Sequence, residues 1–99
     1  MVTVTPAAAE QIRISATQGN MEGMPLRVAV TQLQNGAFHY AMGFDDQHHE
    51  GDTTFQSEGI DIVVAPPSLE LLTGTVIDFV DMEGGKEIIF INPNDPDQK

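Results

Sequence analysis

Apolar and polar side chains alternate in two stretches of the chain, and each stretch predicts a strand. Residues 26–31 and residues 38–44 place apolar side chains at every second position, which is the period of a strand with one buried face. Asn35-Gly36 lies between the two stretches and favours a hairpin turn, because both residues tolerate positive φ. The sequence therefore predicts two antiparallel strands joined by a tight hairpin.

Shorter patterns predict the other elements. Thr5-Pro6 fits the start of a helix with Thr5 as N-cap, apolar side chains follow at helical spacing, and Gly19 ends the helix. A second, short helix is expected over residues 67–73, closed by Gly74. The remaining strands are expected at residues 2–4, 53–57, 60–65, 75–82 and 87–91.

Together these elements predict a compact α+β fold, rich in β-structure, with about seven short strands and two helices. The 99 residues suffice for one domain, which we expect over residues 1–94. The run Asn92-Pro93-Asn94-Asp95-Pro96 cannot continue a strand. Residues 95–99 are therefore expected to form a flexible acidic tail.

The net charge of −11 arises entirely in the second half of the chain. Residues 45–99 contain thirteen acidic side chains and two lysines, whereas residues 1–44 contain two acidic and two basic side chains. Such a surface repels phosphate, which argues against nucleic acid or an anionic membrane as a partner. It favours a protein partner with a basic surface, attracted over a long range.

The chain contains no cysteine, and this excludes disulfides, thiolate nucleophiles and metal centres held by thiolates. No apolar run approaches the roughly 20 residues of a membrane span, and the first residues lack the basic and apolar regions of a secretion signal. We therefore expect a cytoplasmic protein. The sequence shows no acid–base pair, activated nucleophile or phosphate-binding loop, so it predicts no enzymatic activity.

One polar segment, residues 45–52, gathers side chains that could bind a metal ion. The candidate ligands in and near it are His39, Asp45, Asp46, His48, His49, Glu50 and Asp52. Carboxylates and imidazoles suit manganese, iron or zinc. However, adjacent residues of an extended segment point to opposite faces, so His48 and His49 are not expected to share one ion. A solvated loop is the simpler interpretation, and a metal site is the alternative.

Asp78 interrupts an apolar run at residues 76–80. A carboxylate turned inward there needs hydrogen-bond donors or a cation to offset the loss of water. Arg27 lies in a predicted strand and is a candidate partner. We expect Asp78 to brace the sheet or face solvent, and we assign it no catalytic role.

Several motifs resemble one known family. The most specific are Ser68-Leu69-x-x-Leu72-x-Gly74-Thr75-x-Ile77-Asp78-Phe79-Val80 and Phe90-x-Asn92-Pro93-Asn94, with support from Thr5-Pro6-Ala7-Ala8, Leu26-Arg27-Val28-x-Val30 and Phe38-x-Tyr40. In these motifs the chain resembles the A-type iron–sulfur cluster carriers, the HesB/IscA/SufA group. The resemblance runs from about residue 2 to residue 94. It implies a compact, sandwich-like β-fold with helices packed on the strands.

The chain departs from the family pattern where cluster ligands are expected. Family members carry a cysteine in a glycine-rich loop just before the Phe-x-Tyr strand, and here that position is Asn35. They also carry a Cys-Gly-Cys pair shortly after Asn-Pro-Asn, where this chain reads Asp95-Pro96-Asp97-Gln98-Lys99. An amide is neutral and hard, and it cannot replace a soft, anionic thiolate as a ligand. We therefore expect no bound cofactor.

The cysteine-free pattern is similar to that of the DsrR-like proteins of sulfur-oxidising bacteria. This similarity implies a non-catalytic accessory or regulatory factor that acts by protein contacts, with a partner from the sulfite reductase system. The expected contact residues are Gln34, Asn35, Gly36, Asp95 and Asp97, and the chain is expected to be a monomer or a weak homo-oligomer. The alternative is a mononuclear iron or other metal carrier that uses His39, His48, His49 and nearby carboxylates.

Overall fold

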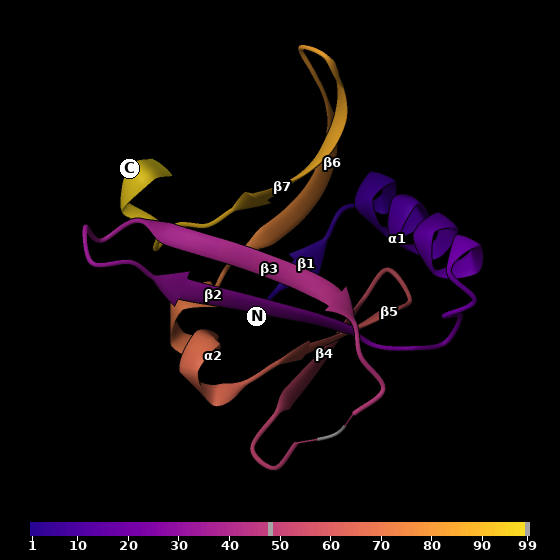
Figure 1. Cartoon of the computed structure of the whole chain (residues 1–99), viewed down its shortest axis with the longest axis horizontal. Coiled ribbons are helices and arrows are strands. Elements are labelled where there is room, and N and C mark those ends of the chain that lie inside the picture. The colour runs from indigo at the N-terminus through magenta and orange to yellow at the C-terminus, as the bar shows by residue number, and fades with distance from the viewer. Residues whose placement is uncertain (48, 99) are drawn as a thin grey trace.

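The computed structural model describes residues 1–47 and 49–98, and within them the expected α+β fold is confirmed (Figure 1). The elements are β1 (Thr3–Val4), α1 (Pro6–Gln18), β2 (Leu26–Gln32), β3 (Phe38–Phe44), β4 (Thr53–Ser57), β5 (Ile60–Val64), α2 (Pro66–Leu72), β6 (Val76–Met82), β7 (Gly85–Ile91) and a 3-10 turn, η1 (Pro96–Gln98). The strands form two sheets, with the orders β1-β6-β7 and β3-β2-β5-β4. In the described part of the chain, no helix is long and apolar enough to cross a membrane.

Helix α1 begins as its sequence predicts. The hydroxyl of Thr5 accepts a hydrogen bond from the backbone N–H of Ala8 at 3.2 Å, and Pro6 occupies the first turn. The same hydroxyl donates to Asp78 Oδ1 at 2.7 Å. Asp78 therefore joins strand β6 to the start of α1. The candidate pairing of Asp78 with Arg27 is wrong, because Arg27 binds two other carboxylates, Asp45 and Asp52.

Strand β2 lies in the middle of the larger sheet and has different neighbours along its two sides. It pairs with β3 over its full length, from Leu26↔Phe44 to Gln32↔Phe38, and with β5 only at Leu26 and Arg27. Where β5 diverges, the buried Ser68 hydroxyl of α2 accepts from the N–H of Val30 at 3.1 Å and donates to its carbonyl at 3.2 Å. The Ser68 side chain thus forms the hydrogen bonds that the Val30 backbone would otherwise form with a neighbouring strand.

The hydrophobic core collects one face of each sheet together with both helices. Its fully buried large side chains include Val28, Ile62, Leu72 and Ile77. On β2, Leu26, Val28 and Val30 are buried, whereas Arg27 and Ala29 between them are only partly buried, as the alternation predicts. This assigns an inner face and an outer face to the β2–β3 pair, which carries most of the candidate site.

Candidate functional site

The β2–β3 hairpin at Asn35-Gly36 is confirmed, but only one of these two residues takes the positive φ expected of both. Leu33 N–H donates to the Ala37 carbonyl at 2.8 Å, and Gly36 N–H donates to the Leu33 carbonyl at 2.9 Å. Gly36 has a φ of +90°, whereas Asn35 is not among the residues with positive φ. The loop is therefore a three-residue turn at residues 34–36 in which glycine alone takes the left-handed conformation.

Asn35 uses its side chain within this turn. Its Oδ1 accepts a hydrogen bond from the backbone N–H of Ala37 at 3.0 Å, the local pattern by which Asn stabilises turns. The expected contact residues Gln34 and Asn35 are both exposed, and Gly36 is half-buried. The position that resembles the family's ligand cysteine is therefore an exposed turn residue with its amide oxygen already hydrogen-bonded.

A network of neutral and charged groups fixes the C-terminal segment to β3. The hydroxyl of Tyr40 donates to Asp95 Oδ2 at 2.7 Å and accepts from Asn92 Nδ2 at 3.2 Å. The Tyr40 ring stacks on Phe90 of β7, with 4.6 Å between the ring centroids and 4° between the planes. Burial raises the pKa of Tyr40 to about 12, and the hydrogen bond to Asp95 adds to the shift.

The segment expected to be a free tail is folded back as far as Gln98. Asp95 is only 4% exposed, and its Oδ1 accepts from the N–H of Asp97 at 2.9 Å. Gln98 closes the turn because its Nε2 donates to the Phe90 carbonyl and its Oε1 accepts from Asn92 N–H, both at 2.9 Å. Figure 1 shows this turn, in yellow, beside the start of β3. Of the two acidic contact residues expected here, Asp95 is buried and Asp97 is exposed.

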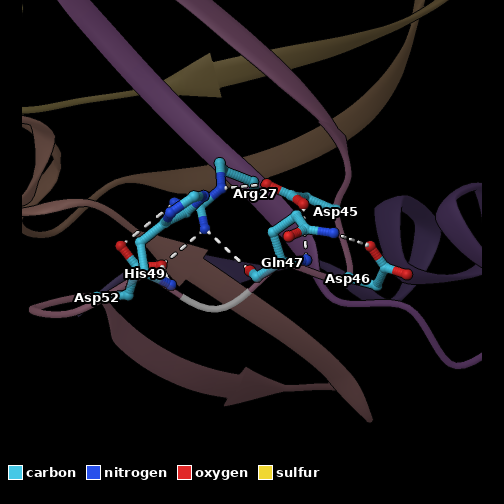
Figure 2. A network of polar contacts seen from close by, with 6 residues as sticks. All are labelled: Arg27, Asp45, Asp46, Gln47, His49 and Asp52. Atoms are coloured by element: carbon cyan, nitrogen blue, oxygen red, sulfur yellow. Dashed lines mark hydrogen bonds and ion pairs between the residues drawn. The ribbon is translucent and has the colours of Figure 1, made fainter.

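At the other end of β3, Arg27 holds the following loop (Figure 2). Its Nε donates to Asp45 Oδ2 at 2.7 Å, and its Nη2 and Nη1 donate to the two oxygens of Asp52 at 2.7 and 3.3 Å. Nη2 also donates to the Gln47 carbonyl at 3.4 Å. The Asp52 side chain is only 1% exposed. Arg27 thus draws both ends of the loop onto the outer face of β2.

The charges of this cluster shift one another's pKa values. The bond from Arg27 lowers the pKa of Asp52, while the N–H of Gln47 and then Arg27 lower that of Asp45. The two carboxylates, Asp52 first, raise the pKa of Arg27 in turn. All three groups are therefore charged at neutral pH.

In the structure, some of the candidate metal ligands bind Arg27, and others are exposed to solvent. Asp45 and Asp52 bind Arg27, and the backbone N–H of His49 donates to Asp52 Oδ2 at 3.2 Å (Figure 2). Asp46 and Glu50 are exposed in the loop, and His39 is exposed on β3 opposite Thr31. His48 lies outside the described residues. Among the residues described, no three side chains of His, Asp or Glu gather as a metal site would require.

Sequence reasoning missed several residues that organise this region. Arg27 was assigned to the wrong carboxylate, and Tyr40, Asn92 and Gln98 were not singled out as a network. The motif Phe90-x-Asn92-Pro93-Asn94 was a usable signal, because Asn92 is 1% exposed and its Nδ2 donates to the Leu71 carbonyl at 2.9 Å. A buried asparagine after a strand implies that a backbone carbonyl nearby needs a donor.

Comparisons with known proteins agree with this fold. Residues 1–95 match the family described as iron-sulphur cluster biosynthesis. The iron-sulfur cluster insertion protein ErpA of Photorhabdus laumondii is 37% identical over 90 residues, which are 91% of this chain and 78% of that protein. ErpA of Yersinia enterocolitica is 34% identical over 90 residues, covering 91% of this chain and 79% of that protein.

Solved structures lead to the same family. A crystal structure of IscA with a 2Fe-2S cluster superposes with a TM-score of 0.80 and 31% identity, covering 95% of this chain and 86% of IscA. The SufA structure of Escherichia coli gives a TM-score of 0.78 and 27% identity, covering 99% of this chain and 85% of SufA. The resemblance to the HesB/IscA/SufA group is thereby confirmed, and the chain belongs to the iron-sulphur cluster biosynthesis family.

Proposed function

We propose that this chain is a non-catalytic, cluster-free member of its family that acts through protein contacts, as an accessory or regulatory factor in bacterial sulfur oxidation. The observation that carries the proposal is Asn35, which stands at the hairpin position where the family pattern has a cysteine. Its amide oxygen is engaged with Ala37 N–H in the turn. A hydrogen-bonded amide has neither the charge nor the softness of the thiolate sulfur that holds iron–sulfur clusters.

The side chains near this hairpin also fit a cluster poorly. The full sequence contains no cysteine, and the Asp95 carboxylate accepts hydrogen bonds from Tyr40 and from the segment that follows it. These groups are hydrogen-bonded to one another and offer no sulfur. We therefore derive no step through a bound cluster. A function of this chain would therefore depend on the charge and the shape of its surface, through contacts with another protein.

The charge of the chain favours one class of partner. A net charge of −11 on 99 residues attracts basic protein surfaces and raises their rate of association. We expect the partner to have a basic patch and to belong to the sulfite reductase system, in keeping with the similarity to DsrR-like proteins. The exposed acids Asp46 and Glu50 lie in the loop that follows β3, and the exposed Asp97 lies in the C-terminal segment that is bound to Tyr40 of β3.

A capture experiment tests this proposal. The full chain, immobilised, is exposed to an extract of the organism that encodes it, and captured proteins are identified by mass spectrometry at low salt and at a few hundred millimolar salt, where the Debye length is about 5 Å. We expect sulfite reductase components to be captured at low salt and largely released at high salt. Capture that does not depend on salt, or salt-sensitive capture of RNA or DNA instead, contradicts the proposal.

A matched pair of variants gives the test its control. One variant neutralises acids near β3, as Asp46→Asn, Glu50→Gln and Asp97→Asn. The other neutralises three exposed acids elsewhere, as Glu10→Gln, Glu22→Gln and Glu70→Gln. Both variants change the net charge equally, so a general effect of charge weakens capture to the same extent in both. We expect the first variant to lose more of the captured partner than the second.

A further inference from the structure

Strand β3 is an open edge of the larger sheet. It ends the strand order β3-β2-β5-β4, and its pairing with β2 runs from Phe38 to Phe44 without a bulge. The strand contains no proline and no lysine, arginine, aspartate or glutamate. Natural proteins usually block such edges with those residues or with bulges, because an open edge can pair with another chain. The opposite edge strand, β4, is in contact with another strand, because Ser57 Oγ accepts a hydrogen bond from the N–H of Val4 in β1 at 3.0 Å.

The alternation of hydrogen bonds shows which backbone groups of β3 point outward. Leu33 N–H bonds to Ala37, and Asp45 N–H bonds to Pro25, at the two ends of the pair. In an antiparallel pair, bonded and non-bonded positions alternate, so Ala41 and Gly43 bond to β2. The N–H and carbonyl groups of Tyr40, Met42 and Phe44 point away from it. These are the groups that an added strand would bind.

Two hollows flank the same stretch of β3, one on each face of the sheet. The inner hollow, of about 330 Å³, is lined by the largely apolar set Leu26, Phe44, Phe79 and Ile88, with Lys86 among its other residues. The outer hollow, of about 300 Å³, lies over Arg27, Ala29 and Ala41. Met42, Gly43 and Phe44 border both hollows. Successive side chains of a strand point to opposite faces, so a strand added beside these residues would direct alternate side chains into the two hollows.

Acidic side chains stand at both ends of this uncharged edge. Asp45 and Asp46 directly follow β3, and Glu50 and Asp52 lie in the same loop, where Arg27 offsets one of the four negative charges. At the other end, Asp95 is bound to Tyr40 and Asp97 follows it. Strand β3 itself thus has no Lys, Arg, Asp or Glu, although Lys86 and Arg27 line the hollows beside it, and acidic side chains stand at its two ends.

We propose that β3 binds an extended segment of a partner protein as an additional strand, and that this segment has an apolar, alternating middle with basic residues on both sides. Main-chain hydrogen bonds to Met42 and Phe44 supply affinity, and the two hollows select side chains. The inference rests on the proposed function, which it deepens by naming the docking element. A second copy of this chain is the weaker occupant, because two chains of charge −11 repel each other.

Amide hydrogen exchange on the wild-type protein tests this directly. The probe is a short synthetic peptide with lysines at both ends and alternating valine and threonine between them. We expect it to slow exchange at the amides of Met42 and Phe44, while Ala41 and Gly43, already bonded to β2, change little. A peptide with glutamates in place of the lysines should bind at least about tenfold more weakly.

Three results would overturn the inference. The peptide could leave Met42 and Phe44 unchanged, it could bind as well with glutamate ends, or protection at these amides could rise with protein concentration in the absence of peptide. The last result would identify a second copy as the occupant. Each result is read from the folded wild-type chain, so a variant that fails to fold does not affect it.

Met42→Pro separates this inference from the proposed function. Proline removes an outward N–H without removing a bond to β2, a position where an edge strand tolerates proline, whereas Met42→Leu keeps the N–H as the control. We expect roughly tenfold weaker peptide binding for Met42→Pro only. If Met42→Pro still captures the partner from the extract in a salt-sensitive way, the edge is not the docking element but the proposed function stands. If wild type captures no sulfite reductase component, the proposed function itself fails.

Discussion

The two ends of strand β3 are held by different physical means. At one end, the charged Arg27 binds the partly exposed Asp45 and the nearly buried Asp52. At the other, the uncharged Tyr40 and the buried Asn92 form hydrogen bonds with Asp95 and the Leu71 carbonyl. Both arrangements fold a loop or a terminal segment back against the same strand. The first depends on paired charges, and the second depends on burial and on satisfied polar groups.

This difference determines what should disturb each end. A cluster of ion pairs that is partly open to solvent responds to salt and to the protonation of its carboxylates. A buried network responds most to the loss of one member, because the remaining groups stay buried without partners. The same contrast bears on function, because both ends leave acidic groups beside a strand that itself has no Lys, Arg, Asp or Glu.

The largest effect is expected from Asn92→Ala. The substitution removes the donor to the Leu71 carbonyl, the donor to Tyr40 and the acceptor for Asn94 N–H, and it leaves a cavity at a side chain that is 1% exposed. We expect the free energy of unfolding to fall by about 3 kcal/mol, measured by urea denaturation. Asp97→Asn, at an exposed position of the same segment, is the control. Equal stabilities for the two variants would show that the network does not hold the C-terminal segment.

The next largest effect on stability is expected at the end of β3 where Arg27 binds two carboxylates. Arg27→Met leaves the nearly buried Asp52 carboxylate without its cation, so the midpoint of thermal unfolding at neutral pH should fall by several degrees. The pKa values of Asp45 and Asp52 are lowered in the folded protein. Their stabilisation is therefore present above the unfolded value, near 4, and is lost as the pH falls through the folded values.

The difference in unfolding midpoint between wild type and Arg27→Met should consequently become smaller at acidic pH. Thermal unfolding at neutral pH and near pH 3 measures it, and Arg13→Met, an exposed arginine on α1 whose Nη1 donates to the Glu58 carbonyl, is the matched control. A gap of constant size at both pH values would mean that packing of the arginine stem, and not its charge, holds the loop.

A smaller effect on the stability of the folded state is expected from the titration of Tyr40, the single tyrosine of the chain. Its pKa is raised to about 12 by burial and by the bond to Asp95, so the folded state retains the phenol proton. The associated stability is complete below the unfolded value, near 10, and is lost as the pH rises through the folded value. Ultraviolet absorbance of tyrosinate reports this residue alone. A midpoint near 10 in the folded protein would show that the hydroxyl is free.

The sequence predicted the elements well because local signals and hydrophobic periodicity agreed. Thr5-Pro6 is the N-terminal cap of α1, and alternating residues fixed which face of β2 is buried. The Asn35-Gly36 signal located the hairpin correctly but not its turn, because it does not distinguish a two-residue loop from a three-residue one. Only the backbone bonds from Leu33 and Gly36 decide between them.

The side-chain partners were predicted less well because they join distant parts of the chain. Tyr40 and Asp95 are 55 positions apart, and Arg27 and Asp52 are 25 apart. Asp78, Asp45 and Asp52 are equally plausible partners for Arg27 in sequence. The choice depends on the strand order, in which β2 pairs with β3 and β5, and β5 pairs with β4, so that Asp45 after β3 and Asp52 before β4 both reach Arg27. Asp95 was assigned to a tail because prolines surround it, whereas three donors within reach make its burial possible.

The central claim is that this chain keeps the family's fold but does not hold an iron–sulfur cluster. Anaerobic incubation of the full chain with iron and sulfide, followed by desalting and visible absorption spectroscopy, tests it most directly. The account predicts no visible chromophore, for wild type and equally for Asn35→Cys, because one thiolate cannot supply the four ligands usual for these clusters. A stable, stoichiometric iron–sulfur chromophore on the wild-type chain would contradict it.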